Sequence, residues 1–414
     1  MHYLDHAASS PLRPEVLELY RGTDGMHANA ASVHAAGRAA KLAIEQAREQ
    51  VAESLGADGA ELIFTASGTE AINLAIQGTF WRRRDVGRVV LVPEGEHHAT
   101  QDTVEWLERH LGAQPVWVPL ERDGRIRLAA WQQALDEHAG EIALATAIWV
   151  NNEIGTVQPV AELARSCADA GVPLHLDAVA AYGHVPIELH KLRAASGSGS
   201  AGLVLLSISA HKIGGPQGIG ALFAARAAQL EPLLHGGGQQ RRLRAGTEDA
   251  LGSLGFAAAA AGMIAQFDAE HERHLVLAER LRSGLASAVP QARINGAGGT
   301  LGGDAAWDVG GVPNILNVSI PGCESDSLLF LLDQAGIAVS SGSACQAGVT
   351  EVSHVIRALG YSEPESRGSL RVSFGPESSV EDVDALLDAL PSAARLAQQA
   401  GLAARRTRFD DRGD

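Results

Sequence analysis

The chain has 414 residues, of which 46% are hydrophobic and 20% are charged, as is typical of a soluble globular protein with more than one packed unit. It has 33 lysines and arginines against 49 aspartates and glutamates, a formal net charge of −16. This acidic balance argues against direct binding to nucleic acid or to an anionic membrane, but not against a local pocket for a small anion.

Seven apolar runs alternate with helix-length stretches in the first part of the chain. The predicted strands are 61–65, 88–92, 114–119, 142–150, 172–177, 203–209 and 221–224. Apolar strands separated by helices indicate a mostly parallel sheet that is covered on both faces. In such α/β folds, ligands bind at the carboxyl ends of the strands.

The pattern changes after Gly246. An alanine-rich stretch at 250–285 predicts a long helix that leads into a second, smaller α+β unit. Its predicted strands are 314–320, 337–340 and 369–374, and its predicted helices are 325–335 and 352–359. We therefore expect a large domain at 13–264, a small domain made of 1–12 with 265–390, and a tail at 391–414. The glycine-rich stretches 194–202 and 296–311 are interpreted as surface loops, and the charged end from Ala403 as frayed.

The three cysteines, Cys167, Cys323 and Cys345, are far apart and form no CxxC pair, which fits a reducing cytoplasm. The N-terminal sequence has neither the basic nor the apolar region of a secretory signal. The longest apolar run, 256–264, is too short to span a bilayer. These features predict a cytoplasmic protein with no membrane span.

The chain has only three lysines that could form an imine through their side-chain amine: Lys41, Lys191 and Lys212. Lys212 directly follows a predicted strand and precedes two glycines, and burial there would lower its pKa, as an imine-forming amine requires. A surface lysine in a loop is the alternative. Asp177 ends another predicted strand, where it can pair with a cationic ring nitrogen or simply cap a helix.

Several other segments carry polar groups that suit a ligand. The turn 66–70 joins a strand to a helix, whose first N–H groups can bind an anion together with Ser209 and His211. His97 and His98 follow a predicted strand, where a histidine can stack on a flat ring and move protons, although a structural histidine is the usual alternative, and no other metal ligands cluster near them. The segment 235–247 contains three consecutive glycines, which allow close approach of a ligand or of another chain, or form a flexible linker.

Cys345 lies in a segment of small polar residues at 340–348, which predicts mobility and an exposed, nucleophilic thiol. Cys167 fits a helix and is predicted to be buried, whereas Cys323 follows a Pro-Gly turn and is ambiguous. Arg371 stands inside a strand-like run, where an arginine often clamps a carboxylate, with an ordinary salt bridge as the alternative.

In this order, these residues resemble the cysteine desulfurases of the NifS/IscS type, which are class V aminotransferases among the fold-type I pyridoxal-phosphate (PLP) enzymes. The resemblance runs from Tyr3 to about Ala389. Its most specific stretches are EHHA at 96–99, NNEIGT at 151–156, AHK at 210–212, the segment 235–247 and SSGSAC at 340–345. The spacing from Cys345 to VIRALG at 355–360 resembles the group I enzymes, which have a long catalytic loop.

The resemblance implies a homodimer that uses PLP and L-cysteine. Lys212 would hold the cofactor covalently, Asp177 would pair with its ring nitrogen, and His97 would stack on the ring. Cys345 would take the substrate sulfur as a persulfide, leave L-alanine, and pass the sulfur to an unidentified acceptor protein. The implied cofactor-binding residues are Gly68, Thr69, Asn152, Asp177, Ser209, His211, Lys212 and Thr247, the last from the partner subunit. The implied substrate-binding residues are Asn29, Asn152 and Arg371.

Two departures from the family pattern keep alternatives open. Ala180 stands where the family usually has a glutamine that bonds the phenolic oxygen of the cofactor, and the turn before Thr69 reads Ala-Ser-Gly. The chain could be a selenocysteine lyase or another class V enzyme that does not need Cys345, or a weakly active paralogue that acts as a binding partner in sulfur transfer. The acceptor could belong to iron–sulfur assembly, tRNA thiolation, cofactor synthesis or DNA phosphorothioation.

Overall fold

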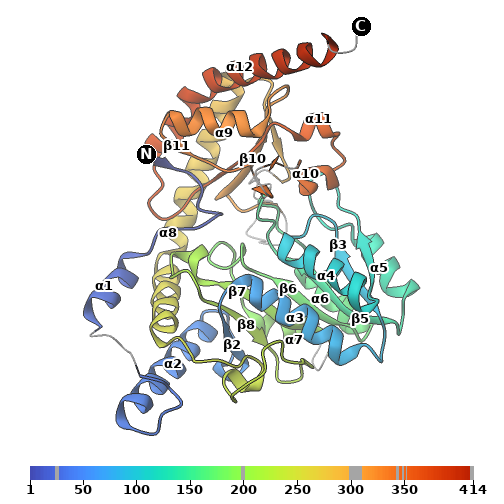
Figure 1. Cartoon of the computed structure of the whole chain (residues 1–414), viewed down its shortest axis with the longest axis vertical. Helices are drawn as coiled ribbons and strands as arrows, with labels where there is room; N and C mark the ends of the chain where they lie inside the picture. Colours follow the sequence, from blue (N-terminus) through green and yellow to red (C-terminus); the bar gives the residue numbers. More distant parts are fainter. Residues whose placement is uncertain are drawn as a thin grey trace.

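Two main sheets divide the chain into two units, which one long helix connects (Figure 1). The structure is a computed structural model that describes residues 1–23, 28–196, 201–297, 310–341, 345–346, 349–350 and 352–410. The predicted glycine-rich loop 296–311 therefore lies largely outside the described residues, and the loop 194–202 lies outside them in part.

The larger sheet has seven strands in the order β2-β8-β7-β6-β5-β3-β4, and only β8 runs antiparallel to its neighbours. These strands are β2 (Leu62–Thr65), β3 (Val89–Pro93), β4 (Gln114–Val118), β5 (Ile142–Ile148), β6 (Pro173–Asp177), β7 (Gly202–Ser209) and β8 (Gly220–Ala224). All but β4 are buried along their whole length, as near-continuous apolar runs require. The predicted α/β class with a mostly parallel sheet is confirmed.

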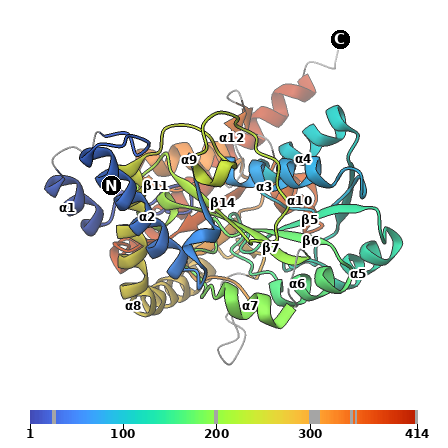
Figure 2. The same cartoon turned by 90° about the horizontal axis from the view of Figure 1, so that it is seen from below.

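Helices cover both faces of this sheet (Figure 2). On one side lie α3 (Gly68–Arg83) and α4 (His98–Leu111), and on the other lie α6 (Val160–Asp169) and α7 (Leu189–Ser196). The remaining helices of this unit are α1 (Pro14–Gly22), α2 (Ala35–Glu53) and α5 (Leu128–Glu137), with short 3₁₀ turns η1 (Gly59–Glu61), η2 (Ala210–Ile213) and η3 (Gln240–Arg242). The covered sheet leaves the carboxyl edge of its strands as the open side of the unit.

The smaller unit is built on an antiparallel sheet in the order β14-β10-β9. Its strands are β9 (Arg293–Asn295), β10 (Ile315–Ser319) and β14 (Ser369–Ser373), with β1 (His2–Tyr3) paired to β11 (Ile337–Ala338) and β12 (Cys345–Gln346) to β13 (Val349–Thr350). Its helices are α9 (Ser325–Gln334), α10 (His354–Ala358), α11 (Glu363–Ser366) and α12 (Val380–Asp410). Leu4 is buried in the core of this unit, so the start of the chain packs with its second half.

Helix α8 (Ala250–Ala288) has 39 residues and belongs to both cores. Phe256 packs in the core of the larger unit, whereas Leu277 and Leu281 pack in that of the smaller unit. By length and composition alone, α8 could cross a membrane, which differs from the sequence prediction that the run at 256–264 was too short. More than half of its apolar window, 56%, is buried inside the fold, as in the core helix of a globular protein.

The predicted tail at 391–414 is a further difference. Helix α12 runs across position 391 and continues as helical backbone to Asp410. Ala393 and Ala394 lie one helical turn after Leu390, Ala397 lies one turn further on, and all four are buried in the core of the smaller unit. This apolar spacing keeps the helix packed beyond the proline at 391, so Ala393, Ala394 and Ala397 belong to the core of the smaller unit rather than to a separate tail.

Candidate active site

Most of the predicted site residues meet at the carboxyl edge of the larger sheet. Strands β3, β5, β6 and β7 run parallel, so the residues that follow them lie at the same edge. Together with the start of α3 and with β14 of the smaller unit, these residues line a cavity of about 370 Å³. Its lining includes Gly68, Thr69, His97, Asn152, Asp177, Ser209, His211, Lys212 and Arg371.

The first turn of α3 forms one wall of the cavity. The Ser67 hydroxyl accepts a hydrogen bond from the Glu70 N–H at 3.1 Å, and a Glu70 carboxylate oxygen accepts one from the Ala66 N–H at 2.8 Å. These two contacts leave other N–H groups of the turn for a ligand. A Cβ on Gly68 would lie 2.7 Å from the Val179 side chain, so glycine is required there. The buried Ser209 hydroxyl beside this turn has no partner among the described residues, as a phosphate-binding group would need.

Lys212 lies in η2, directly after β7, with its ammonium group inside the cavity lining. Its Nζ donates to the carbonyl oxygen of Ala7 and, at 3.1 Å, to that of Ala8. Burial and the positive charge of Arg371 lower the pKa of Lys212 to about 8, against the opposing effect of nearby carboxylates. A substantial neutral fraction of the amine is therefore present in mildly alkaline solution.

Asp177 and His97 both serve as local caps as well as cavity walls. Asp177 Oδ1 accepts from the Val179 N–H at 2.9 Å, and burial raises the pKa of this carboxyl group to about 6. His97 Nδ1 accepts from the Ala99 N–H at 3.0 Å at the start of α4, which leaves the proton of the neutral ring on Nε2. Burial, followed by the charge of Lys212, lowers the pKa of His97 to about 4, so the ring is neutral at physiological pH.

Arg371 brings a guanidinium group from the smaller unit into the cavity. Its Nη1 donates to the Asn152 carbonyl oxygen at 3.1 Å, and its Nη2 donates to Asp5 Oδ1 at 2.9 Å. Arg371 Nε and Asn152 Oδ1 are buried and have no partner among the described residues, which suits recognition of a substrate carboxylate and amine. Sequence reasoning missed Asp5, and no local signal could have revealed a partner 366 residues away.

The structure does not bring every predicted residue to this cavity. Asn29 and Thr247 are exposed and do not line it, and the Asn29 side chain instead accepts from the Ala31 N–H at 2.9 Å. His98 and His354 also line it, and their ring centroids are 4.9 Å apart; the sequence offered His98 only beside His97 and gave His354 no site role. The backbone of Cys345 pairs with that of Thr350, whereas its side chain and much of the predicted loop 340–348 lie outside the described residues.

The other two cysteines are buried thiols. Burial raises the pKa of Cys167 far above its ordinary value and that of Cys323 to about 11. The Cys323 thiol also donates to the Ala394 carbonyl oxygen at 3.5 Å, which resolves its ambiguous position in the sequence as a core residue. Thiols of this kind are inert because the reactive thiolate is disfavoured.

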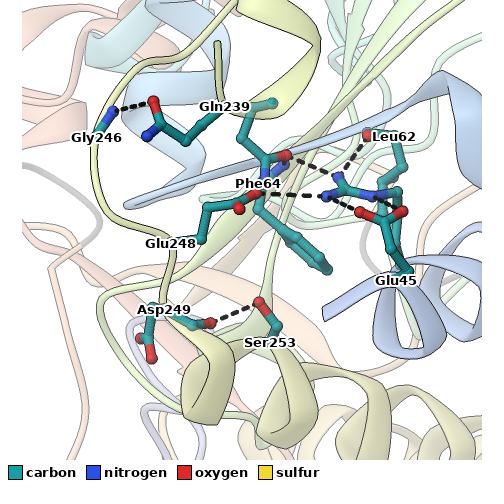
Figure 3. A network of polar contacts seen from close by, with 10 residues as sticks. Glu45, Leu62, Phe64, Gln239, Gly246, Glu248, Asp249 and Ser253 are labelled. Atoms are coloured by element: carbon teal, nitrogen blue, oxygen red, sulfur yellow. Dashed lines mark hydrogen bonds and ion pairs between the residues drawn. The ribbon is translucent and has the colours of Figure 1, made fainter. Parts of the chain in front are cut away.

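A polar network holds the predicted close-approach segment 235–247 against the larger unit (Figure 3). Gln240 Oε1 accepts from Arg48 Nη1 at 2.7 Å and from the Phe64 N–H at 2.8 Å, while Gln240 Nε2 donates to Glu248 Oε1 at 2.5 Å. Glu248 directly follows Thr247 in the chain. The network therefore helps to fix the position of Thr247 on the surface of the larger unit.

Comparison with known proteins gives consistent matches over almost the whole chain. Residues 2–386 match the family model described as aminotransferase class V. An IscS-like cysteine desulfurase of Mycobacterium tuberculosis is 41% identical over 98% of this chain and 99% of its own length. A solved NifS-like protein superposes with a TM-score of 0.83 at 29% identity, over 95% of this chain and 99% of that one.

A second solved structure, of SspA in complex with cysteine, has a TM-score of 0.74 at 28% identity, over 92% of this chain and 100% of that one. These likenesses confirm the predicted fold-type I architecture, and class V aminotransferases depend on PLP. The chain therefore belongs to the class V aminotransferase family, in its branch of NifS- and IscS-like cysteine desulfurases.

Proposed function

We propose that this protein is a PLP-dependent cysteine desulfurase, which converts L-cysteine into L-alanine and a persulfide on Cys345. The observation that carries the proposal is one cavity that joins an amine of lowered pKa, a buried carboxylate and a guanidinium clamp. Lys212, Asp177 and Arg371 supply these three groups, and they come from different strands and from both units.

The described residues fit PLP. The N–H groups of the first turn of α3 and the unpartnered Ser209 hydroxyl suit its phosphate, and Asp177 suits its ring nitrogen because a cation there would keep the carboxylate ionised. Bound PLP supplies an electron sink that activates the carbon frame of an amino acid. Lys212 is the proposed point of covalent attachment, since its pKa of about 8 leaves a nucleophilic fraction near neutral pH.

The remaining cavity residues act on the substrate. Arg371 presents an unpaired, buried Nε–H to a carboxylate, and the Asn152 side chain lies beside it. His97 is neutral because its pKa is about 4, so its ring can stack on a flat cofactor without placing a positive charge beside it. We propose Cys345 as the sulfur acceptor because Cys167 and Cys323 are buried thiols with raised pKa values.

A second copy of the chain would complete the site. Thr247 and Asn29 do not reach the cavity of their own subunit, so we propose that Thr247 of the partner subunit contacts the phosphate. Val33 is 88% exposed and Leu42 is 59% exposed around α2, which supports an apolar contact face there.

A cytoplasmic location is proposed from the two free, unpaired cysteines among the described residues. The sulfur acceptor is proposed to be another protein.

The test begins with the holoenzyme and L-cysteine. Equal amounts of alanine and sulfide should form in the presence of a reductant, and borohydride followed by peptide mapping should place the pyridoxyl group on Lys212. Label on Lys41 or Lys191 would contradict the site assignment.

Cys345→Ser separates the proposal from its rivals. A desulfurase with this substitution loses turnover of L-cysteine but still binds PLP, whereas a selenocysteine lyase keeps its activity on selenocysteine. If no PLP absorbance stays with the wild-type protein after unbound PLP has been removed, a paralogue that acts only as a binding partner would be favoured.

A further inference from the structure

Strand β14, which carries Arg371, also holds one end of the segment that contains Cys345. The Ser340 N–H donates to the Arg371 carbonyl oxygen at 3.1 Å, and the Arg371 N–H donates to the Ser340 carbonyl oxygen at 2.6 Å. The backbone of Ser340 is therefore held against that of Arg371 in β14, and the Arg371 side chain lines the cavity.

The other end of the segment is held at Ser353, where α10 begins. The Ser353 hydroxyl accepts from the Ile356 N–H at 3.2 Å as the helix cap, and it donates to Glu153 Oε2 at 2.5 Å. Ser353 is 4% exposed and Glu153 is 3% exposed, so water does not compete for this contact. The single hydroxyl proton of Ser353 is thus committed to Glu153.

Glu153 is itself rigidly placed beside the clamp. Its N–H donates to Asn151 Oδ1 at 2.9 Å, and its carbonyl oxygen accepts from Asn317 at 3.3 Å. Its neighbour in the chain, Asn152, provides the carbonyl oxygen that binds the Arg371 side chain. Glu153 therefore links the start of α10 to the residues that would hold the substrate carboxylate.

We propose that the hydrogen bond between Ser353 and Glu153 is a positioning contact, which sets where the Cys345 segment ends relative to the Arg371 clamp. The inference rests on the proposed function, in which Cys345 must meet the sulfur of a substrate held by Arg371. Sulfur transfer needs the reacting atoms close and aligned, and a displacement of about 1 Å can cost a rate factor of about 100. Neither Ser353 nor Glu153 needs to touch the substrate for this role.

The experiment compares four variants of the PLP-loaded enzyme. Ser353→Ala and Glu153→Ala each remove the contact, their double mutant removes both partners, and Glu153→Gln keeps an acceptor for the serine hydroxyl. Ser362→Ala is the matched control, because Ser362 caps α11 and also donates to a glutamate, Glu365, at 2.5 Å, but on the exposed surface. Substrate affinity is measured from the change in cofactor absorbance on adding L-cysteine, and kcat from alanine release.

We expect Ser353→Ala and Glu153→Ala each to lower kcat by about 10- to 100-fold while substrate affinity changes less than about threefold. The double mutant should be no slower than either single variant, since both remove one contact. Glu153→Gln should stay nearer the wild type, and Ser362→Ala should leave kcat unchanged. If Glu153→Ala does not fold, the comparison of Ser353→Ala with Glu153→Gln remains decisive.

An unchanged kcat in Ser353→Ala would overturn the inference, because Ser353 would then be only a helix cap. Losses that multiply in the double mutant, or a parallel fall of affinity and kcat, would also overturn it. Wild-type enzyme that releases no alanine from L-cysteine would instead refute the proposed function.

Discussion

Charged side chains from three distant parts of the chain shift the pKa of the Lys212 amine. Burial and Arg371 lower its pKa to about 8, whereas Asp5 and Asp177 raise it. We expect PLP capture by the apoprotein to accelerate as pH rises through about 8, because only the neutral amine is nucleophilic. Asp5→Asn removes a carboxylate that favours the charged amine, so the profile should shift to lower pH. Stopped-flow absorbance at several pH values measures both profiles, and an unchanged or upward shift would contradict this account.

Ala180 is the second residue with a testable consequence. It lines the cavity beside Asp177, where the family usually places a glutamine that donates to the phenolic oxygen of the cofactor. A hydrogen bond to a charged group contributes about 1.5–3 kcal/mol. We therefore expect Ala180→Gln to tighten PLP binding by roughly 10-fold or more. Equilibrium titration of the apoprotein with PLP checks this, and an unchanged affinity would mean that another group already satisfies that oxygen.

Residues at the ends of predicted strands gave the clearest sequence signal for a role in the site. Asp177 and Lys212 stood out because each directly follows an apolar run, and because the chain has only three lysines. Asp5 and His354 carried no comparable signal. Asp5 acquires its partner, Arg371, only when the first residues pack beside β14, so no local pattern could show the pair.

At the scale of elements, η3 is the most strained turn among the described residues. Gln240, Arg241 and Arg242 all have positive φ, at 44°, 58° and 65°, and this left-handed conformation costs about 1–2 kcal/mol per residue. The hydrogen bonds of the Gln240 side chain to Arg48, Phe64 and Glu248 offset this cost.

We expect Gln240→Ala to lower the free energy of unfolding by about 1–3 kcal/mol, because it leaves buried donors of Arg48 and Phe64 without an acceptor. Urea denaturation measures the change. Arg242→Ala, in the same turn but with an exposed side chain, is the control and should lie within about 0.5 kcal/mol of wild type. Equal effects of the two substitutions would show that the network does not stabilise the turn.

Elements with strong periodicity were predicted almost to their observed bounds, and short ones were not. The long strands and helix α8 differ from their predictions by only a few residues at the ends. Strand β1 has only two residues, too few for an alternating pattern, and it exists because its backbone pairs with that of β11 across the chain. Helix α12 was not among the predicted helices, and its continuation past the proline at 391 depends on the packing of Ala393 and Ala394 in the core of the smaller unit.

At the scale of the whole molecule, buried histidines gather where the two units meet. The rings of His184 and His274 lie 6.3 Å apart, and His274 also contacts the Gly375 carbonyl oxygen at 3.2 Å. Burial lowers the pKa of His6 and of His274 to about 4, and that of His184 to about 3. All three are therefore neutral in the folded protein at physiological pH.

These histidines predict loss of stability in weak acid. The unfolded chain binds protons at His6, His184 and His274 below a pKa of about 6.5, whereas the folded protein resists protonation until about 4. Stability should therefore fall as pH drops from about 6.5 towards 4, by up to about 1.4 kcal/mol per pH unit for each histidine. Calorimetry between pH 7.5 and about 5 tests this. His274→Gln should make the decline shallower, while the exposed His190→Gln should not.

The pairing of β1 with β11 has a consequence for synthesis on the ribosome. The backbone of His2 pairs with Ile337, and Leu4 enters a core whose other members begin at Leu277. His2 and Leu4 leave the exit tunnel long before these partners, so they must wait, unpaired, although every strand of the larger sheet is complete by Ala224. At 5–20 residues per second this delay is on the order of half a minute, during which Leu4 and the unpaired backbone beside it are open to chaperones.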